Sequence, residues 1–323
     1  METNDDLRKE LAHVYELLRE TDQERISYAQ RLNQALLELG PARFNSNHYL
    51  TLRSEERIIE LDFPVRPRCR DWSSSPHVQR LATQLKLRHQ DWQKILIQVD
   101  DLTKQLLKIP LHEGASTTEP YWTNGWLPGL DAVLLYHFVK TLHPKVYFEV
   151  GSGNSTKFVR KAIVDHGLNT RIVSVDPFPR AEIDLICDQI YRVGLEDFDL
   201  NMLHELTADD IVFIDNSHRA FPNSDVTVFF TEILGRLPQG ILYGLHDVFL
   251  PYDYPEGWGP RYYNEQYLLA AYLFGGADGD TIIFPAGHVS HEPDLVKILD
   301  GLWTSPFHEG ILPYGGSFWL TKG

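Results

Sequence analysis

Short apolar runs alternate with longer segments of helical periodicity over the second half of the chain. The apolar runs are residues 146–150, 171–175, 190–193, 211–214 and 240–245. A helical stretch at 226–237 separates the last two runs, and a helix near 265–274 and strands at 281–284 and 317–321 follow. Because strands that alternate with helices form a parallel sheet covered on both faces, the pattern predicts an α/β fold.

The first hundred residues carry two amphipathic stripes in which apolar positions recur every three or four residues. They cover about 5–39 and about 76–108, and Arg88 interrupts the second. Each stripe must bury its apolar face on the other stripe, on a second chain or on the rest of the protein. We therefore expect a coiled-coil-like helical module at 1–110, an α/β domain at 111–323, and a homo-oligomer formed through the N-terminal helices.

The first predicted strand runs into a glycine turn at residues 149–156. Gly151 and Gly153 allow a sharp turn and a close approach of the backbone to a ligand, and a helix beginning near Asn154 would direct free N–H groups at that ligand. The dinucleotide fingerprint requires a third glycine where this chain has Thr156, so an ordinary NAD-binding turn is disfavoured. A tight turn that binds no ligand is the structural alternative.

Two acidic residues lie beside this turn in the predicted sheet. Glu149 comes two residues before the first glycine and is interpreted as an acid next to a ligand that carries positive charge or hydroxyl groups. Asp176 ends the following strand, at about the distance downstream where a Rossmann-type sheet presents its ribose-binding acid. A nucleotide-like ligand is therefore expected at this edge of the sheet.

The region from about residue 120 onward resembles a class I S-adenosylmethionine-dependent methyltransferase, a Rossmann-like sheet of seven strands. The first motif of that family, an acid followed by glycines two and four residues later, matches residues 149–153. The run at 316–322 suits its last strand, which inserts antiparallel beside the fifth. The resemblance implies the following cofactor-binding residues: Glu149, Gly151, Gly153, Asn154 and Ser155 near the methionine part of S-adenosyl-L-methionine, and Asp176 on the ribose hydroxyls.

Polar residues follow two of the predicted strands. Asp215 and His218 come after 211–214, and His246 and Asp247 come after 240–245. Because the carboxyl ends of neighbouring parallel strands form the crevice where ligands bind, these side chains should face one another. We expect Asp215, Asp247 and His246 to hold a divalent cation. Oxygen ligands suit Mg²⁺, and a histidine admits Mn²⁺ or another transition metal ion.

This arrangement resembles the metal-dependent small-molecule methyltransferases, including the catechol type, in which acids after the fourth and fifth strands hold the metal. A metal would lower the pKa of an acceptor hydroxyl and orient it. His218 would take the proton, with His246 as the alternative base or ligand and Asp247 beside them. The alternatives are that each histidine only bonds a loop carbonyl, and that the two aspartates lie outside the site.

A loop at 251–266 is rich in aromatic and proline residues and is expected to cover the acceptor. Rings such as Tyr254 and Trp258 suit stacking on a sugar or an aromatic ring, and Arg261 would pair with an acidic substituent. The alternative is a surface loop that packs these rings for stability. The aromatic residues of the run 120–126, Tyr121, Trp122 and Trp126, are expected to roof the cofactor or acceptor pocket.

Composition narrows the class of protein further. At 323 residues and 43% hydrophobic content the chain can bury a full-sized core, and its formal charge of −15 argues against a nucleic-acid partner. Two cysteines, Cys69 and Cys187, provide no disulfide framework and fit a reducing cytosol. No apolar stretch is long enough for a membrane span, and a cytoplasmic location is expected.

The sequence as a whole predicts a methyltransferase that acts on a hydroxyl of a small molecule or a carbohydrate. One alternative is a methyltransferase fold that serves as a non-catalytic binding or assembly module. A less favoured alternative is a nucleotide-dependent oxidoreductase on the same type of sheet.

The first stripe generates a prediction about assembly. If it forms an intermolecular coiled coil, deletion of residues 1–40 should lower the molecular mass measured by light scattering while the α/β domain stays folded. A full-length protein that already scatters as a monomer would contradict this and favour packing within the chain.

Overall fold

The computed structural model describes residues 58–59, 61–305 and 310–323. The chain divides into two compact units. One contains Arg70–Asp253 and Tyr263–Gly323, and the other contains Met1–Cys69 and Tyr254–Tyr262. The first amphipathic stripe lies outside the described residues, so the expected homo-oligomer stays a prediction.

A seven-stranded sheet forms the centre of the larger unit, in the order β3-β2-β1-β4-β5-β7-β6. The strands are β1 (Val146–Val150), β2 (Arg171–Val175), β3 (Gln189–Tyr191), β4 (Ile211–Ile214), β5 (Leu242–Leu245), β6 (Thr281–Pro285) and β7 (Phe318–Thr321). Strands β1 to β5 are parallel, and β7 pairs antiparallel with both β5 and β6. The predicted Rossmann-like sheet, with its last strand beside the fifth, is confirmed.

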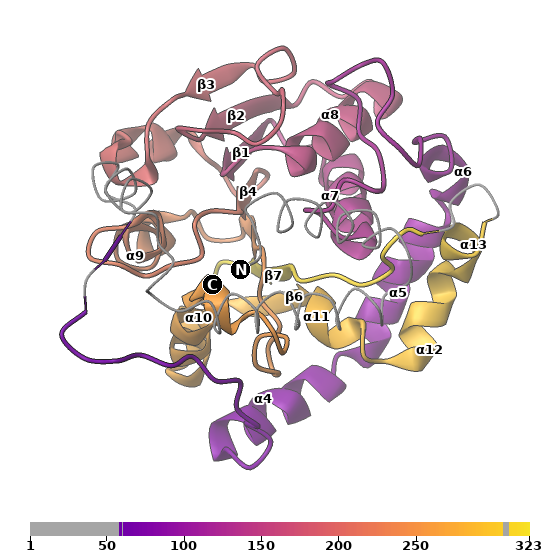
Figure 1. Ribbon diagram of the computed structural model, residues 1–323. Helices are drawn as coiled ribbons and strands as arrows, with labels where there is room; N and C mark the ends of the chain where they lie inside the picture. Colours follow the sequence, from indigo (N-terminus) through magenta and orange to yellow (C-terminus); the bar gives the residue numbers. More distant parts are fainter. Residues whose placement is uncertain (1–57, 60, 306–309) are drawn as a thin grey trace, which may run out of the picture. The chain divides into compact units, whose positions relative to one another are not determined.

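Helices cover the two faces of this sheet (Figure 1). The connection from β1 to β2 contains α8 (Asn154–His166), and the connection from β4 to β5 contains α9 (Asp225–Val228). These connections run in opposite directions across the sheet, so right-handed crossovers place their helices on opposite faces. The helix α7 (Gly129–Leu142) packs against α8, and α10 (Glu265–Phe274) connects β5 to β6.

Shorter helical segments complete the unit. The segment after α9 continues as a π-helical turn at Phe229–Ile233 and a 3₁₀ turn at Leu234–Arg236, which together fill the helix expected at 226–237. The others are the helices α11 (Ala286–Val289), α12 (Pro293–Val296) and α13 (Asp300–Trp303), and 3₁₀ turns at Leu195–Asp197, Leu200–Glu205, Ala277–Gly279 and Lys297–Leu299. A further 3₁₀ turn at Gly259–Arg261 belongs to the smaller unit.

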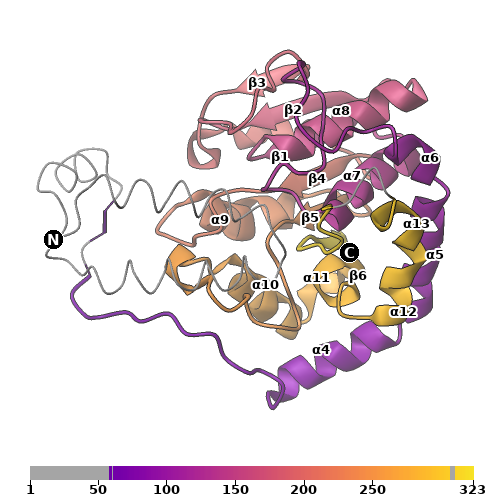
Figure 2. The same ribbon diagram turned by 45° about the vertical axis from the view of Figure 1, so that its right-hand side comes forward.

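The second amphipathic stripe belongs to the same compact unit as the sheet. It forms three helices, α4 (Pro76–Lys86), α5 (His89–Asp100) and α6 (Thr103–Leu106), instead of one helix over 76–108. Its buried positions are Val78, Leu81, Leu85, Trp92, Leu96, Val99, Leu102 and Leu106. All but the first belong to the core that the sheet also forms, and α5 lies along α12 in both views (Figures 1 and 2). The stripe therefore buries its apolar face on the α/β domain, and no unit boundary falls at residue 110.

The smaller unit contains part of the aromatic loop. The Arg261 guanidinium lies over the Trp258 ring, 3.9 Å from its centroid, and the Tyr254 and Trp258 rings stack at 6.2 Å. The Cys69 thiol donates to the Tyr254 carbonyl at 3.5 Å. These contacts are those of a packed loop, and its expected covering of the acceptor stays a prediction.

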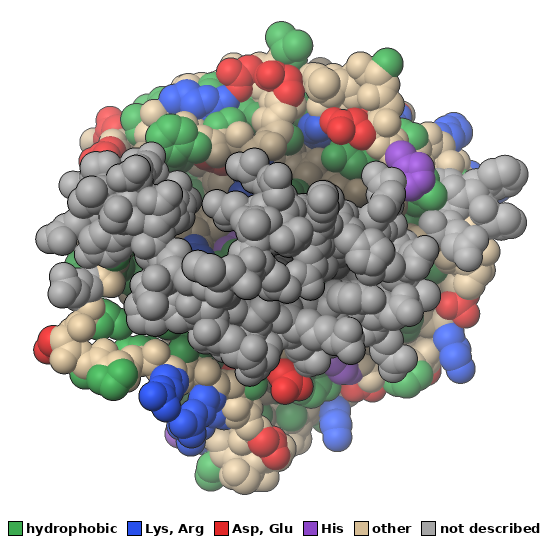
Figure 3. Space-filling model, viewed as in Figure 1, with side chains coloured by type: hydrophobic (Ala, Val, Ile, Leu, Met, Phe, Trp, Pro, Cys, Tyr) green, Lys and Arg blue, Asp and Glu red, His purple; other side chains and the backbone are tan. Residues whose placement is uncertain are grey.

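The described helices and the charges on one face of the molecule bear on the expected partners. None of the described helices combines the length and the apolar character that a membrane crossing requires. On the face drawn in Figure 3, acidic and basic side chains are interspersed among neutral ones, apart from one small group of basic side chains at lower left. The expected cytoplasmic location and the expected absence of a nucleic-acid partner stay predictions.

Candidate functional site

The glycine turn after β1 lies at the centre of the sheet, where the strand order reverses between β1 and β4. Gly151 has a φ of 77°, and a Cβ there would lie 1.8 Å from the Asp215 carbonyl oxygen. Only glycine fits so close to the neighbouring strand end. A Cβ at Gly153 would meet no atom within 4 Å, so the turn leaves open space at the start of α8. Ligands of open α/β sheets bind at this point of reversal.

The Asp176 carboxylate lies against this turn. One oxygen accepts from the Ser152 N–H at 2.7 Å and the other from the Phe178 N–H at 2.7 Å. The residue follows β2 and is half-buried, so solvent or a ligand can still reach it. The structure thus places Asp176 beside the glycine turn, as its proposed role on the ribose requires.

Glu149 is fully buried and is bound by hydroxyl groups of its own chain. Tyr147 donates to Oε1 at 2.9 Å, and Thr156 donates to Oε2. The Thr156 hydroxyl in turn accepts from the Gly153 N–H at 3.0 Å. Burial raises the pKa of Glu149 to about 7. The residue therefore fastens β1 to the first turn of α8, and its expected contact with the methionine part of the cofactor stays a prediction.

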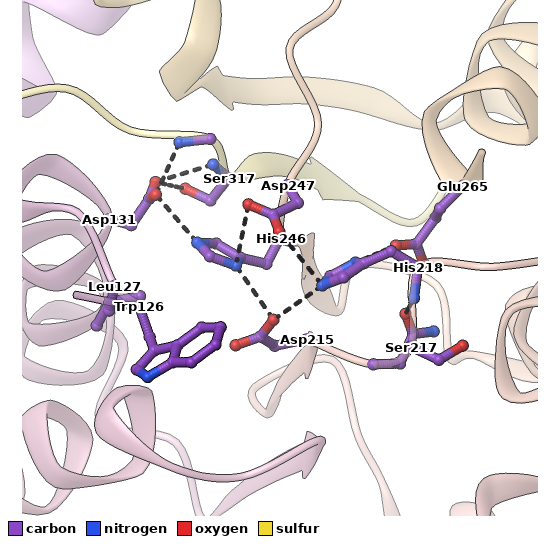
Figure 4. Close-up of polar contacts among 12 residues, drawn as sticks. Trp126, Leu127, Asp131, Asp215, Ser217, His218, His246, Asp247, Glu265 and Ser317 are labelled. Carbon is purple, nitrogen blue, oxygen red and sulfur yellow. Dashed lines mark hydrogen bonds and ion pairs between the residues drawn. The ribbon is translucent and has the colours of Figure 1, made fainter. Parts of the chain in front are cut away.

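Four polar side chains converge at the ends of β4 and β5 (Figure 4). His246 Nδ1 lies 3.1 Å from Asp215 Oδ1 and 3.7 Å from Asp247 Oδ1. His218 Nε2 lies 3.3 Å from the same Asp215 oxygen and 3.4 Å from Asp247 Oδ2. Ligand atoms of Asp215, His218 and His246 all lie within 4.8 Å of one another, close enough for a single metal ion. The expectation that these strand ends face one another is met, and the metal itself stays a proposal.

A buried carboxylate from α7 supports His246 from the other side. Asp131 Oδ2 lies 3.2 Å from His246 Nε2 and also accepts from the Gly316 N–H at 2.7 Å. Its Oδ1 accepts from the N–H of Ser317 at 2.8 Å and from the hydroxyl of Ser317 at 2.5 Å. Asp131 therefore connects α7, the end of β5 and the approach to β7 at one point.

Glu265 supports His218 in the same way. It is the first residue of α10 and is fully buried, and its Oε2 lies 2.9 Å from His218 Nδ1. Asn264, just before it, accepts from the Ala220 N–H at 2.6 Å and donates its own N–H to the His218 carbonyl at 2.9 Å. The start of α10 thus holds both the ring and the backbone of His218.

The electrostatics of the group favour charged side chains. Burial would raise the pKa of Asp215, but His246 and His218 outweigh burial and hold that pKa far below its usual range. Burial likewise disfavours a charged His218, but its hydrogen bonds to Asp215 and Glu265 raise its pKa to about 10. The charges of Asp215 and Asp247 raise the pKa of His246 against the effect of burial. The carboxylates therefore create a strong preference for positive charge at this position.

Two residues of the group have left-handed backbone conformations. The φ angle of His218 is 58° and that of Asp247 is 54°. Residues other than glycine seldom adopt this region, and asparagine, aspartate and histidine do so more often than the rest. The conformation directs both side chains toward the centre of the group.

Trp126 forms the edge of the site. Its indole lies beside the Asp215 carboxylate (Figure 4) and is 58% exposed. The Arg180 guanidinium lies over the ring, 4.3 Å from its centroid. Trp122 from the same run is buried in the core, and the expected roof stays a prediction.

Residues 148–248 match a protein family described as "Methyltransferase domain". This part of the chain is a methyltransferase domain. It spans the glycine turn, Asp176 and the strand ends of β4 and β5, so the predicted methyltransferase is confirmed for this part of the chain. A methyltransferase domain gives no support to the oxidoreductase alternative.

Solved structures resemble a longer part of the chain, more distantly. An O-methyltransferase from Bacillus cereus in complex with SAH is 14% identical, covers 71% of this chain and 91% of its own, and gives a TM-score of 0.36. The SAH-bound methyltransferase PaMTH1 from Podospora anserina is 12% identical. The match covers 82% of this chain and 100% of PaMTH1, with a TM-score of 0.36. MycE from the mycinamycin pathway, in complex with Mg, SAH and mycinamycin VI, is 14% identical. The match covers 83% of this chain and 68% of MycE, with a TM-score of 0.35. Curated protein sequences yield no match.

Sequence reasoning missed two members of the site. Asp131 is a single acid in the otherwise apolar first turns of α7, and that anomaly is the signal that could have found it. Glu265 looks like an ordinary acid in the first turn of a helix. Nothing in the local sequence connects either residue to its histidine.

The close packing at Gly151 generates a prediction. Replacing Gly151 by Ala should destabilise the domain by about 1–3 kcal/mol, because the new Cβ overlaps the backbone at Asp215 and the φ angle is positive. Urea denaturation followed by circular dichroism measures the change. Gly235→Ala, where a Cβ meets nothing within 4 Å, is the matched control and should leave the midpoint nearly unchanged.

Proposed function

We propose that the protein is a metal-assisted O-methyltransferase that transfers the methyl group of S-adenosylmethionine to a hydroxyl of a small molecule or a carbohydrate. One observation carries the proposal: Asp215, His246 and Asp247 converge at the carboxyl ends of β4 and β5, next to the glycine turn of β1. Donor and acceptor would then meet within one crevice.

The residues around the glycine turn fit S-adenosylmethionine. Gly153 leaves space where the donor would lie, and α8 begins there with backbone N–H groups that can receive a carboxylate. Asn154 and Ser155 form the first turn of that helix. Asp176, held by Ser152, presents a carboxylate to the ribose hydroxyls.

The strand ends fit a divalent cation. Asp215 and Asp247 offer two carboxylates, and His246 Nδ1 lies 3.1 Å from the first and 3.7 Å from the second, a set that suits Mg²⁺ or Mn²⁺. His218, whose ring nitrogen is also within 4.8 Å of ligand atoms of Asp215 and His246, lies close enough to be a further ligand. Carboxylates that converge without a compensating positive charge would repel one another. When bound, such an ion lowers the pKa of an acceptor hydroxyl and fixes its orientation.

The protein's own side chains complete the reaction. The sulfonium of the donor makes its methyl group electrophilic, so alignment of the acceptor oxygen and removal of its proton are the main tasks. His218 Nε2 faces Asp215 and Asp247, and we assign it as the base that takes the proton. A bound cation would supply the positive charge that these carboxylates otherwise place on His218, and the neutral ring could then accept the proton. Trp126 stands at the edge of the site and would limit access of water to the transferred methyl group.

Donor binding provides the first test. Calorimetry should show binding of S-adenosylmethionine and of its demethylated product, and none of NAD. Asp176→Ala should weaken donor binding by about 1–3 kcal/mol, because the ribose hydroxyls lose a charged acceptor. Tight binding of NAD without a response to S-adenosylmethionine would refute the donor assignment.

Metal dependence provides the second test. EDTA should abolish methyl transfer to a panel of hydroxylated acceptors, and Mg²⁺ or Mn²⁺ should restore it. Asp215→Asn and Asp247→Asn should lose activity while fold and donor affinity persist, whereas His218→Ala should lower turnover with metal affinity retained. Asp209→Asn is the control. It removes one carboxylate from an exposed residue just before β4, at the other end of the strand from Asp215, and should leave methyl transfer unchanged. Full activity in chelator would exclude the metal.

A further inference from the structure

Both histidines of the centre have one ring nitrogen toward the paired aspartates and the other toward a fully buried carboxylate. His246 directs Nδ1 to Asp215 and Nε2 to Asp131. His218 directs Nε2 to Asp215 and Nδ1 to Glu265. The two rings thus use opposite nitrogens, and each has a separate carboxylate behind it (Figure 4).

The hydrogen bonds of Asp131 determine where the hydrogen of His246 lies. Two backbone N–H groups, those of Gly316 and Ser317, donate to this carboxylate, one to each oxygen. Asp131 therefore acts as an acceptor, and His246 must donate from Nε2. In the neutral ring the Nδ1 lone pair then points at Asp215 and Asp247.

Glu265 fixes the opposite tautomer of His218. Its Oε2 is 2.9 Å from Nδ1, and its Oε1 has no hydrogen-bond partner among the described residues. A hydrogen on Nδ1 leaves the Nε2 lone pair toward the centre. The left-handed backbone of His218, bonded to Asn264, keeps the ring in this orientation.

We propose that Asp131 and Glu265 are positioning residues with different tasks, an inference that rests on the proposed metal-assisted function. Asp131 makes His246 a metal ligand through Nδ1, and Glu265 keeps Nε2 of His218 free to take the acceptor's proton. Carboxylates behind metal-bound histidines raise ligand basicity and fix the ring, and their loss typically lowers metal affinity by about 10- to 100-fold.

Asp131→Asn tests the first task. The Asp131 carboxylate accepts from His246 on one side and from the N–H groups of Gly316 and Ser317 on the other. An asparagine has only one acceptor oxygen, so its NH₂ group would face one of these donors and could not accept a hydrogen bond from it. Calorimetric titration of the full chain should show an affinity for Mn²⁺ that is about 10- to 100-fold lower, with a much smaller change for Mg²⁺, because nitrogen ligands matter more to Mn²⁺. Equal losses for both ions would mean that Asp131 contributes only charge, and would overturn the proposal.

Two controls separate positioning from folding. Ser317→Ala removes one hydrogen bond of Asp131, and the acceptor of the Trp319 indole N–H, but leaves the contact of Asp131 with His246, so Mn²⁺ affinity should stay at the wild-type value. Donor affinity should be unchanged in both variants. A loss of Mn²⁺ affinity in Ser317→Ala as large as that in Asp131→Asn would overturn the assignment.

Glu265→Gln tests the second task. Turnover should fall by about 10- to 100-fold while the affinity for Mn²⁺ stays unchanged, because His218 is not a ligand in this scheme. A loss of Mn²⁺ affinity would make His218 a ligand and overturn the division of tasks.

Nuclear magnetic resonance of the wild-type protein tests the tautomers without any substitution. With ¹⁵N-labelled histidine and Zn²⁺ as a diamagnetic probe, His246 should be metal-bound through Nδ1 and carry its hydrogen on Nε2. Binding through Nε2 would overturn the inference. A wild-type chain that binds none of the three ions would refute the metal-assisted function itself, whereas ion binding that is identical in wild type and Asp131→Asn would refute only the positioning role.

Discussion

A carboxylate that water cannot reach must find its hydrogen-bond donors inside the protein, and Asp131 is the residue on which this constraint acts most strongly. Its donors come from the backbone before β7, from the Ser317 hydroxyl and from His246. Leaving such a carboxylate without partners would cost several kcal/mol, so these segments are held in one arrangement. The position of the His246 ring, and with it the geometry of the centre, depends on this contact.

The sequence predicts the sheet and its polar edge because both follow from local patterns. Apolar runs locate each strand, and parallel pairing brings the residues after β4 and β5 to one edge, which is why Asp215, His246 and Asp247 could be named in advance. The supporting carboxylates could not be named. Asp131 and His246 are 115 residues apart and Glu265 and His218 are 47 apart, and no local pattern encodes such contacts.

Two differences between pattern and structure have physical causes. The helical stripe over 76–108 keeps its apolar period up to Leu85, but its next position is Arg88, where the chain turns into a second helix. At the glycine turn, Thr156 takes the place of the third glycine, and its hydroxyl links the Gly153 N–H to the buried Glu149. A side chain there stabilises the turn instead of obstructing it.

The strand order also bears on how the molecule is assembled. The strand β7 comes last along the chain, yet it lies between β5 and β6, which do not pair with each other. Until β7 inserts, β5 has an open edge and Asp131 lacks the donors at Gly316 and Ser317. During synthesis, which proceeds from the N-terminus, the earlier strands can pair first. The geometry of the centre is therefore a late product of folding, and a chain that stalls before residue 316 would retain much of its sheet without an ordered centre.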